Sequence, residues 1–360
     1  MMVPYLFMNL DRKDLNISKI NYPLNQKEWL YRQLTKDAKH TQEWKEYNEA
    51  QTKEKLMLYK LLDELLNIVP TRAYTFGRPR KSLRDMLFCC LIKIYSNTSS
   101  RRTISDLKLA MEAGYIKDVP HFNTLLNYFN DSGMSILLPY LISVSALPLK
   151  NCEEKFAIDS TGFGTGRFDR WLNVRTQEDS KKKGFRKCHV ICGTKTNIIC
   201  EAIITEGKAN DSPLFNPLLT NTSHLFNIKE ISADKAYSSR ANLELAKELQ
   251  IMPYIPFKSN ITGKSKGSPT WAEMFKYFTE NYMEFAEHYH QRSNVESCFS
   301  MIKKKFGDFT RCKNPKSQDN EILCKVLVHN ITCLIHEIFE LGIDVNFLKI
   351  SKKFPAQKVV

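Results

Sequence analysis

The chain has 360 residues, 42% hydrophobic and 26% charged, an ordinary balance for a globular protein of one large or two smaller domains. It carries 53 Lys and Arg against 39 Asp and Glu, and the resulting net charge of +14 favours a polyanionic partner such as nucleic acid. A basic protein that binds no nucleic acid stays an alternative on charge alone. The start of the chain lacks the pattern of a secretory signal, and the most apolar segment, residues 136–149, is too short for a bilayer span. We therefore expect an intracellular protein without a membrane-embedded part.

The ten cysteines do not follow the spacing of a metal site or a disulfide framework. No C-x-x-C pair occurs; Cys89 and Cys90 are adjacent, and Cys188 and Cys192 are four residues apart. In a reduced compartment such residues usually behave as small buried apolar side chains. We expect that role for most of them, which disfavours a structural zinc site.

Residues 1–150 are expected to be helical. The first 55 residues are polar and predict helices packed loosely on the rest, whereas residues 52–69 predict a buried helix that ends before Pro70. The apolar positions of that helix are Leu56, Leu61, Leu62 and Leu65.

A compact helical module is expected over residues 78–130. It opens with a basic cluster and a helix that Ser82 is placed to cap. Two short helices joined by a turn then give residues 103–130 a helix-turn-helix outline, although an ordinary helical bundle has the same pattern. Under the first interpretation, the side chains placed to contact DNA bases are His121, Asn123 and Thr124.

After about residue 150 the pattern changes from helical to mixed, which indicates an α/β fold with a mixed sheet. The expected elements are, in order, a strand (155–163), a hairpin turning at 193–197, a helix capped by Asp211 or Ser212, a strand ending near Asp234, a helix (238–250), a strand (251–258), and long helices to about residue 341.

Four residues near the end of this region, Tyr289, Arg292, Glu296 and Lys303, have spacings that place them on one helical stripe within about 60°. A carboxylate, two cations and a phenol in that arrangement can hold a metal ion and a phosphodiester together. The alternative is a solvated cationic face, with Glu296 only the capping-box partner of Ser293. Beside the stripe lies an apolar face of Val295, Phe299, Ile302 and Phe306.

This spacing, Y-x-x-R-x-x-x-E-x-x-x-x-x-x-K, resembles the motif of DDE transposases from prokaryotic insertion sequences. Asp159 follows a short apolar strand, and Asp234 lies in an A-D-x-x-Y motif with Tyr237, as the two catalytic aspartates of that family do. The segment from Asp211 into the next helix is also similar. The resemblance covers most of the chain and is densest over residues 154–306.

The resemblance implies a ribonuclease-H-like catalytic core, with a mixed sheet flanked by helices, that holds two divalent ions. Asp159, Asp234 and Glu296 would be both the catalytic residues and the metal ligands. Carboxylate oxygens are ligands that suit Mg²⁺, and Mn²⁺ is a possible substitute.

The same resemblance assigns DNA contacts to Arg292 and Lys303, and a positioning role to Tyr289. Basic segments flank the site at residues 181–187 and 303–313 and favour salt-dependent phosphate binding. The candidates in and before the first of these segments are Lys182, Arg186 and Trp171, the last able to stack on an unpaired base or to anchor its own loop.

The expected domains are an N-terminal helical, DNA-binding region (1–150), a catalytic domain (151–341) and a basic C-terminal tail (342–360). The short distance between Asp234 and Glu296 leaves room for only a modest insertion, over about residues 251–285.

The function that follows is a transposase that binds the terminal inverted repeats of an insertion sequence, cleaves at its ends and joins the 3′-OH to target DNA. Double-stranded DNA, a homodimer in the synaptic complex and a cytoplasmic, nucleoid-associated location go with it. Two alternatives are a ribonuclease-H-like nuclease without strand transfer and a non-catalytic DNA-binding derivative.

Overall fold

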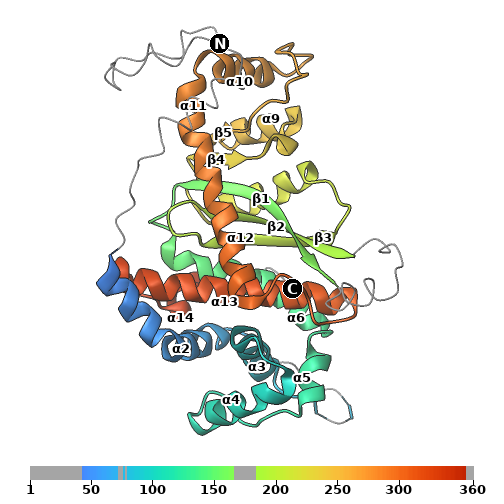
Figure 1. Ribbon diagram of the computed structural model, residues 1–360, viewed down its shortest axis with the longest axis vertical. Coiled ribbons are helices and arrows are strands. Elements are labelled where there is room, and N and C mark those ends of the chain that lie inside the picture. Colours follow the sequence, from blue (N-terminus) through green and yellow to red (C-terminus); the bar gives the residue numbers. More distant parts are fainter. Residues whose placement is uncertain (1–42, 72–75, 78, 166–183, 354–360) are drawn as a thin grey trace, which may run out of the picture.

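The computed structural model describes residues 43–71, 76–77, 79–165 and 184–353. The centre of this described structure is one mixed sheet of five strands: β1 (Lys155–Gly164), β2 (Phe185–Gly193), β3 (Ile199–Glu206), β4 (Glu230–Ala233) and β5 (Met252–Tyr254). The strand order is β3-β2-β1-β4-β5 (Figure 1). β1, β2 and β3 form an antiparallel meander, and β4 and β5 add in parallel on the other side of β1. This is a mixed sheet of the kind expected from the sequence.

The β2–β3 hairpin turns where the sequence predicts it. Asn197 adopts the left-handed conformation (φ 59°) that Asn tolerates in tight turns. The buried carboxylate of Glu153 accepts bonds from the backbone N–H of Thr196 (2.6 Å) and of Lys195 (3.2 Å). Glu153 therefore fixes the hairpin turn, a structural role that its sequence context does not indicate.

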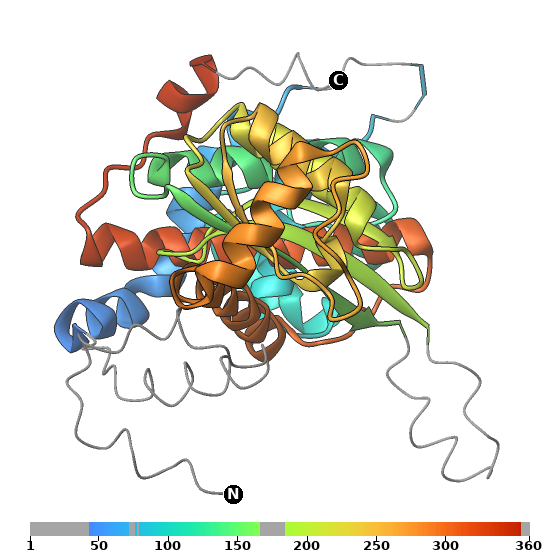
Figure 2. The same ribbon diagram turned by 90° about the horizontal axis from the view of Figure 1, so that it is seen from above.

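Helices after β3 cover both faces of the sheet. They are η3 (Ser212–Leu214), α8 (Phe215–Ser223), η4 (Lys235–Tyr237), α9 (Arg240–Glu248), α10 (Pro269–Glu280), α11 (Tyr282–Tyr289), η5 (His290–Arg292), α12 (Ser293–Phe306), α13 (Pro315–Glu340) and α14 (Phe347–Lys353). α8 packs on β2 and β3, and α12 packs on β1. α11, η5 and α12 follow one another as a column in front of the sheet (Figure 1), and α13 crosses the molecule beneath the strands (Figure 2).

The N-terminal helices are α2 (Trp44–Leu66), α3 (Leu83–Ser96), α4 (Ser100–Glu112), α5 (Phe122–Tyr128) and α6 (Ser132–Ala146), which continues into η2 (Leu147–Leu149). α13 packs against α2, α3 and α6. Its buried Asn330 donates to Ser145 Oγ (2.9 Å) on α6 and to the carbonyl of Ile199 (2.7 Å) on β3. The helical half and the sheet therefore share one core around α13.

The N-terminal helices differ in detail from the expectation. Ser82 caps α3 as predicted, accepting from the backbone N–H of Asp85. The first buried helix, α2, starts at Trp44 instead of near Thr52, and Leu56 is 76% exposed. The prediction for Leu56 is wrong because the buried stripe runs through Leu58 and its helical neighbours, each worth about 1.5–3 kcal/mol when fully buried.

Two further expectations need correction. Asp211 does not cap the helix that follows, since its carboxylate turns to Lys187 (2.7 Å), and a short 3-10 turn precedes α8. Residues 342–353 do not form a free tail, because α14 contacts α2 and α6 and Phe347 is fully buried. Between 255 and 285, the described chain forms helix α10 and the start of α11, and no strand.

Eight of the ten cysteines are buried and none forms a disulfide, so most of them act as small apolar residues, as expected. Two helical runs, Ser132–Leu149 and Pro315–Glu340, are long and apolar enough by composition to cross a membrane, and the first is longer than the sequence suggested. Within the fold, 61% and 78% of their apolar windows are buried, which is the position of core helices.

Candidate active site

The register of β1 and β4 brings two aspartates side by side. Ile158 on β1 lies opposite Ala233 on β4 in a parallel pair, so the next residues, Asp159 and Asp234, occupy adjacent positions about 4.8 Å apart in the sheet direction. Asp234 ends β4 and starts η4, where its carboxylate accepts from the backbone N–H of Lys235 (2.6 Å). Two carboxylates therefore meet where β4 ends beside the middle of β1.

Alternate residues of β1 face opposite sides of the sheet. We call the side of Asp159, Thr161 and Phe163 the α12 face, since Arg292 and Lys303 reach these three side chains. The other side is the α8 face, where Phe156 packs on Phe226 just after α8. Asp159 therefore points toward the helical column.

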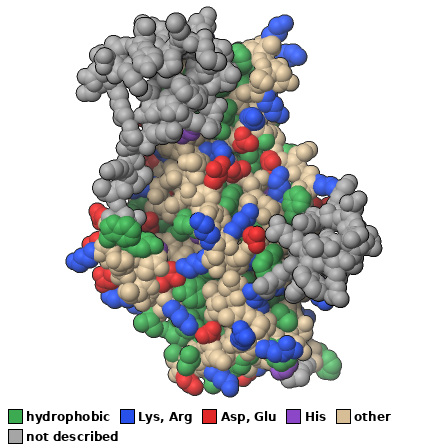
Figure 3. Space-filling model, viewed as in Figure 1, with side chains coloured by type: hydrophobic (Ala, Val, Ile, Leu, Met, Phe, Trp, Pro, Cys, Tyr) green, Lys and Arg blue, Asp and Glu red, His purple; other side chains and the backbone are tan. Residues whose placement is uncertain are grey.

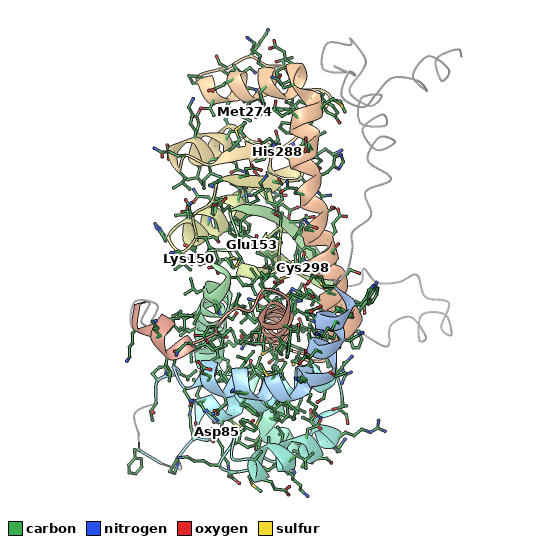
Figure 4. The ribbon with its side chains drawn as sticks, turned by 90° about the vertical axis from the view of Figure 1, so that its left-hand side faces the viewer. Asp85, Lys150, Glu153, Met274, His288 and Cys298 are labelled. Atoms are coloured by element: carbon green, nitrogen blue, oxygen red, sulfur yellow. The ribbon has the colours of Figure 1, made fainter. Side chains whose placement is uncertain are left out.

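The helical column delivers the third carboxylate. No side chain caps α12, because η5 leads straight into it, so Ser293 does not act as an N-cap. Arg292 Nη1 donates to Asp159 Oδ2 (2.5 Å), and its Nη2 donates to Glu296 Oε1. One guanidinium therefore joins the carboxylates of β1 and α12. In Figure 4 this part of the column lies between the labelled His288 and Cys298.

Burial and neighbouring charge act together on Asp159. Burial is the largest cause that raises the pKa of Asp159, and the charges of Asp234 and Glu296 raise it further. The backbone N–H of Ser160 and the guanidinium of Arg292 act in the opposite direction. The side chain of Glu296 is 58% exposed, whereas that of Asp159 is 20% exposed. The three carboxylates are therefore close enough to repel one another. Asp159 is largely shielded from solvent, and Glu296 is open to it.

Lys303 and Tyr289 lie along the same column. Lys303 Nζ donates to Thr161 Oγ1 (2.6 Å) and lies 5.5 Å from the Phe163 ring centroid. Burial lowers the pKa of Lys303. Tyr289 ends α11 and its ring lies 5.9 Å from the Arg292 guanidinium. Tyr289, Arg292 and Glu296 thus lie together where α11, η5 and α12 join, so the expected stripe is not on one continuous α-helix. Lys303 lies further along α12, against β1.

The donor set fits a hard divalent cation. Three carboxylates around a half-buried position are typical of Mg²⁺ or Mn²⁺ sites, and the cation among them here is the guanidinium of Arg292. Within the part of the chain that the structure describes, no group of three or more His, Cys, Asp or Glu side chains is already arranged to hold a metal ion. Asp159, Asp234 and Glu296 would therefore hold the ion only after Arg292 turns away from at least one carboxylate.

A hollow of about 610 Å³ adjoins Asp234. Its polar rim is formed by Asp234, Lys235 and Lys258. Its walls are aromatic, and they come mainly from α10 and α11: Phe257, Phe278, Tyr282, Phe285 and Tyr289. The sequence reasoning missed this hollow, because its walls join residues more than 20 positions apart whose spacing carries no recognisable motif.

A buried polar cluster lies on the α8 face, directly behind the carboxylates. Asp211 pairs with Lys187 (2.7 Å) and lies 3.3 Å from His189 Nδ1, while His189 Nε2 meets Thr205 Oγ1 (2.8 Å). The Asn242 side chain donates to the Tyr237 carbonyl (2.8 Å). This cluster holds the turn after Asp234. The sequence indicates Asp211, Tyr237 and the basic segment that ends at Lys187, but not their meeting.

Among the other candidate DNA contacts, the residues that the structure describes already bond to groups of the protein. Arg186 on β2 makes a two-pronged pair with Asp319 (2.7 Å for each bond), which already engages its guanidinium. Trp171 and Lys182 lie outside the described residues. His121 caps α5 through Nδ1, which accepts from the backbone N–H of Asn123 (3.3 Å). DNA binding by these residues stays a prediction.

Comparisons with known proteins identify the family of the chain. A family model described as a transposase DDE domain matches residues 150–331, which span β1, β4, α12 and most of α13. No curated protein sequence matches the chain. One similar solved structure is a piggyBac transposase synaptic complex with hairpin DNA (TM-score 0.38, 12% identity, 84% of this chain and 78% of that one). Another is a simian T-cell lymphotropic virus intasome in complex with the PP2A regulatory subunit B56 gamma (TM-score 0.22, 17% identity, 47% and 54%).

Proposed function

The chain belongs to the transposase DDE domain family and is a transposase, and from this premise we propose its reaction in detail. It binds the terminal inverted repeats of an insertion sequence, cleaves phosphodiester bonds at the ends and transfers the 3′-OH to target DNA. The observation that supports this most is the meeting of Asp159 and Asp234 through the β1–β4 register, with Glu296 joined to Asp159 by Arg292.

Asp159, Asp234 and Glu296 would hold two divalent ions, Mg²⁺ or Mn²⁺. When bound, such ions activate the attacking oxygen and stabilise the leaving oxygen. The burial that raises the pKa of Asp159 disfavours its ionised form without a cation, which supports a cation as its natural partner.

Arg292 and Lys303 are the cations placed to hold the reacting phosphate. Both lie on the α12 face beside the carboxylates, and both now bond to groups of β1: Asp159 and Thr161. An incoming phosphate can replace these partners, because Lys and Arg bind phosphate oxygens by the same donors. Tyr289 supports Arg292 from the other side through its ring.

Double-stranded DNA is the partner that this chemistry requires, and the net charge of +14 supports it. Joining two ends in one complex requires two active sites, so we propose a homodimer on DNA. Action on a bacterial chromosome places the protein in the cytoplasm, with the nucleoid.

The test is a strand-transfer assay with the full chain. Duplexes from both flanks of the coding region, which carry the candidate terminal repeats, are incubated with a supercoiled target and Mg²⁺. We expect cleaved ends joined to the target, and neither product with Asp159→Ala, Asp234→Ala or Glu296→Ala. Retained activity in all three variants would overturn the assignment.

The same assay separates the two alternatives. A nuclease without strand transfer would release hydrolysed ends and leave the target unjoined. A non-catalytic DNA-binding derivative would shift the duplex in a gel and leave it intact with both Mg²⁺ and Mn²⁺.

A further inference from the structure

A second hollow, of about 540 Å³, lies away from the carboxylates, between the N-terminal helices and the loop that follows α12. Gly307 ends α12 with φ 86°, a conformation that favours glycine, and turns the chain into this loop. The hollow is lined by residues of α3, α4, α5 and the end of β1, together with Phe309, Thr310, Arg311, Cys312 and Lys313.

The charge of this second hollow is one-sided. Lys93, Arg101, Arg311 and Lys313 line it, and none of its described lining residues is acidic. The nearest buried carboxylate, that of Glu321, accepts from the backbone N–H of Arg311 (2.9 Å) and of Cys312 (2.9 Å). The described lining of the hollow therefore has an excess of cations.

Two of the arginines are held in place before any ligand arrives. Arg311 donates to the carbonyls of Thr98 (2.7 Å) and Asn97 (2.9 Å), and Arg101 lies 4.7 Å from the Phe122 ring centroid. Side chains that are already ordered lose less entropy when they bind. Arg101 and Lys313 are exposed at the rim and can reach a ligand directly.

Two elements lead from the carboxylates to this hollow. β1 runs from Asp159 to Gly164 and Thr165, and Gly164 forms a bridge with Phe309. α12 runs beside it from Glu296 to Phe306. At about 3.3 Å per residue, Thr165 lies about 20 Å along β1 from Asp159. In the same view as Figure 1, Lys and Arg side chains recur from the centre of the molecule toward the end formed by α4 and α5 (Figure 3).

We propose that this hollow binds the phosphate backbone of the DNA duplex whose end lies at the carboxylates. DNA advances about 3.4 Å per nucleotide of one strand, so the bound phosphate is about six nucleotides from the reacting one. Arg101 and Lys313 contact the phosphate, and the apolar side chains of Phe122 and Leu126 lie against the neighbouring sugar. This inference rests on the proposed function, since it takes the carboxylates as the place of reaction.

The test compares two pairs of substitutions that change the net charge equally. Arg101→Ala with Lys313→Ala removes the rim cations, and Lys60→Ala with Lys349→Ala removes two exposed cations on α2 and α14, away from the hollow. Arg101→Gln with Lys313→Gln keeps the side-chain length if the alanine pair folds poorly. Binding of the flanking duplexes is measured by fluorescence anisotropy across 50 to 200 mM salt.

We expect the rim pair to bind about tenfold or more weakly at low salt, with a slope of log affinity on log salt that is shallower by about 1.8, or 0.9 per lost phosphate contact. The control pair should keep the wild-type slope. A neutral methylphosphonate placed about six nucleotides from the end should weaken wild-type binding and have no further effect on the rim pair. A rim pair that behaves like the control pair, or an equal methylphosphonate effect in both proteins, overturns the proposal.

The strand-transfer assay on the same proteins separates this proposal from the function. If the wild type joins ends to target while the rim pair binds like the control pair, only the hollow is misassigned. If the rim pair shows the expected loss while the wild type neither cleaves nor joins, the hollow stands as a DNA site and the proposed reaction fails.

Discussion

The two faces of the sheet carry similar residue types with different partners. On the α12 face, Asp159 and Thr161 bond to Arg292 and Lys303, side chains that a phosphate or a metal ion can displace. On the α8 face, the charge of Asp211 is matched by Lys187, and His189 is fully buried.

The difference shows why charge alone does not identify a functional residue. Asp159 meets two further carboxylates and a single shared cation, so its site has an excess of negative charge that a divalent ion would balance. Among the described residues, Asp211 meets two basic side chains and no second carboxylate in direct contact, so its charge is already balanced. Removing a charge should therefore affect reactivity on one face and stability on the other.

The largest expected effect is on the α12 face. Asp159→Asn should reduce strand cleavage about a thousandfold or more, because the variant loses a metal ligand. The free energy of unfolding should stay the same or rise at neutral pH. Burial raises the pKa of Asp159, so an ionised Asp159 carboxylate destabilises the folded state, and the neutral Asn side chain does not. Cleavage rates and urea unfolding check both parts. Asp344→Asn, an exposed carboxylate on the loop before α14, is the charge-matched control.

The α8 face should respond in the opposite way. Asp211→Asn should lower the free energy of unfolding by about 2–4 kcal/mol, because Lys187 loses its buried partner. Cleavage at a temperature where the variant is folded should fall less than about tenfold. Urea unfolding and single-turnover cleavage are the measurements, and adding Lys187→Met should restore part of the stability. Full stability with lost cleavage would place Asp211 in the reactive site and remove the contrast.

Much of this contrast was accessible from the sequence, but not all of it. The stripe of Arg292, Glu296 and Lys303 was expected from helical periodicity, whereas the meeting of Asp159 and Asp234 was expected only from the family resemblance. The pairing of Asp211 with Lys187 could not be predicted from the sequence, because an Asp just before a helix is equally well suited to accept a hydrogen bond as its N-cap. Its pairing with Lys187 depends on the β1–β2 register and on the packing of η3, which are set by tertiary contacts.

The second hollow was hidden for the same reason. Arg101 and Lys313 are more than 200 positions apart, and tertiary packing brings α4 and the loop after α12 to the same hollow. A basic segment was expected after Glu296, but not its meeting with α4. The helix-turn-helix outline of residues 103–130 corresponds to α4 and α5, whose base contacts stay a prediction.

A pH dependence should appear on the α8 face through Glu201. Burial raises the pKa of Glu201 to about 7, so the folded state binds more protons than the unfolded state between about pH 4.5 and 7, and stability falls as the pH rises through this window. Glu201→Gln removes this loss and should stabilise the protein by about 1–3 kcal/mol at pH 8, with little change near pH 4.5. Urea unfolding at both pH values is the measurement. If Glu201→Gln changed the free energy of unfolding equally at both pH values, ionisation of Glu201 would not be the cause.

The smallest effect is expected for Lys303 on the α12 face. Lys303→Gln should weaken DNA binding by about five- to tenfold and make the salt dependence shallower by about one unit of slope, because one phosphate contact is lost. Lys303→Arg keeps the charge and should keep the slope. Anisotropy titrations at several salt concentrations decide it, and an unchanged slope in the Gln variant would remove Lys303 from the DNA path.

The central claim is that Asp159, Asp234 and Glu296 form one metal centre, and calorimetric titration with Mn²⁺ tests it most directly. We predict saturable binding by the wild type, and binding weakened about tenfold or more in Asp159→Asn, Asp234→Asn and Glu296→Gln. Asp211→Asn, on the opposite face of the sheet, should bind as the wild type does. Equal Mn²⁺ binding by all five proteins would contradict the account.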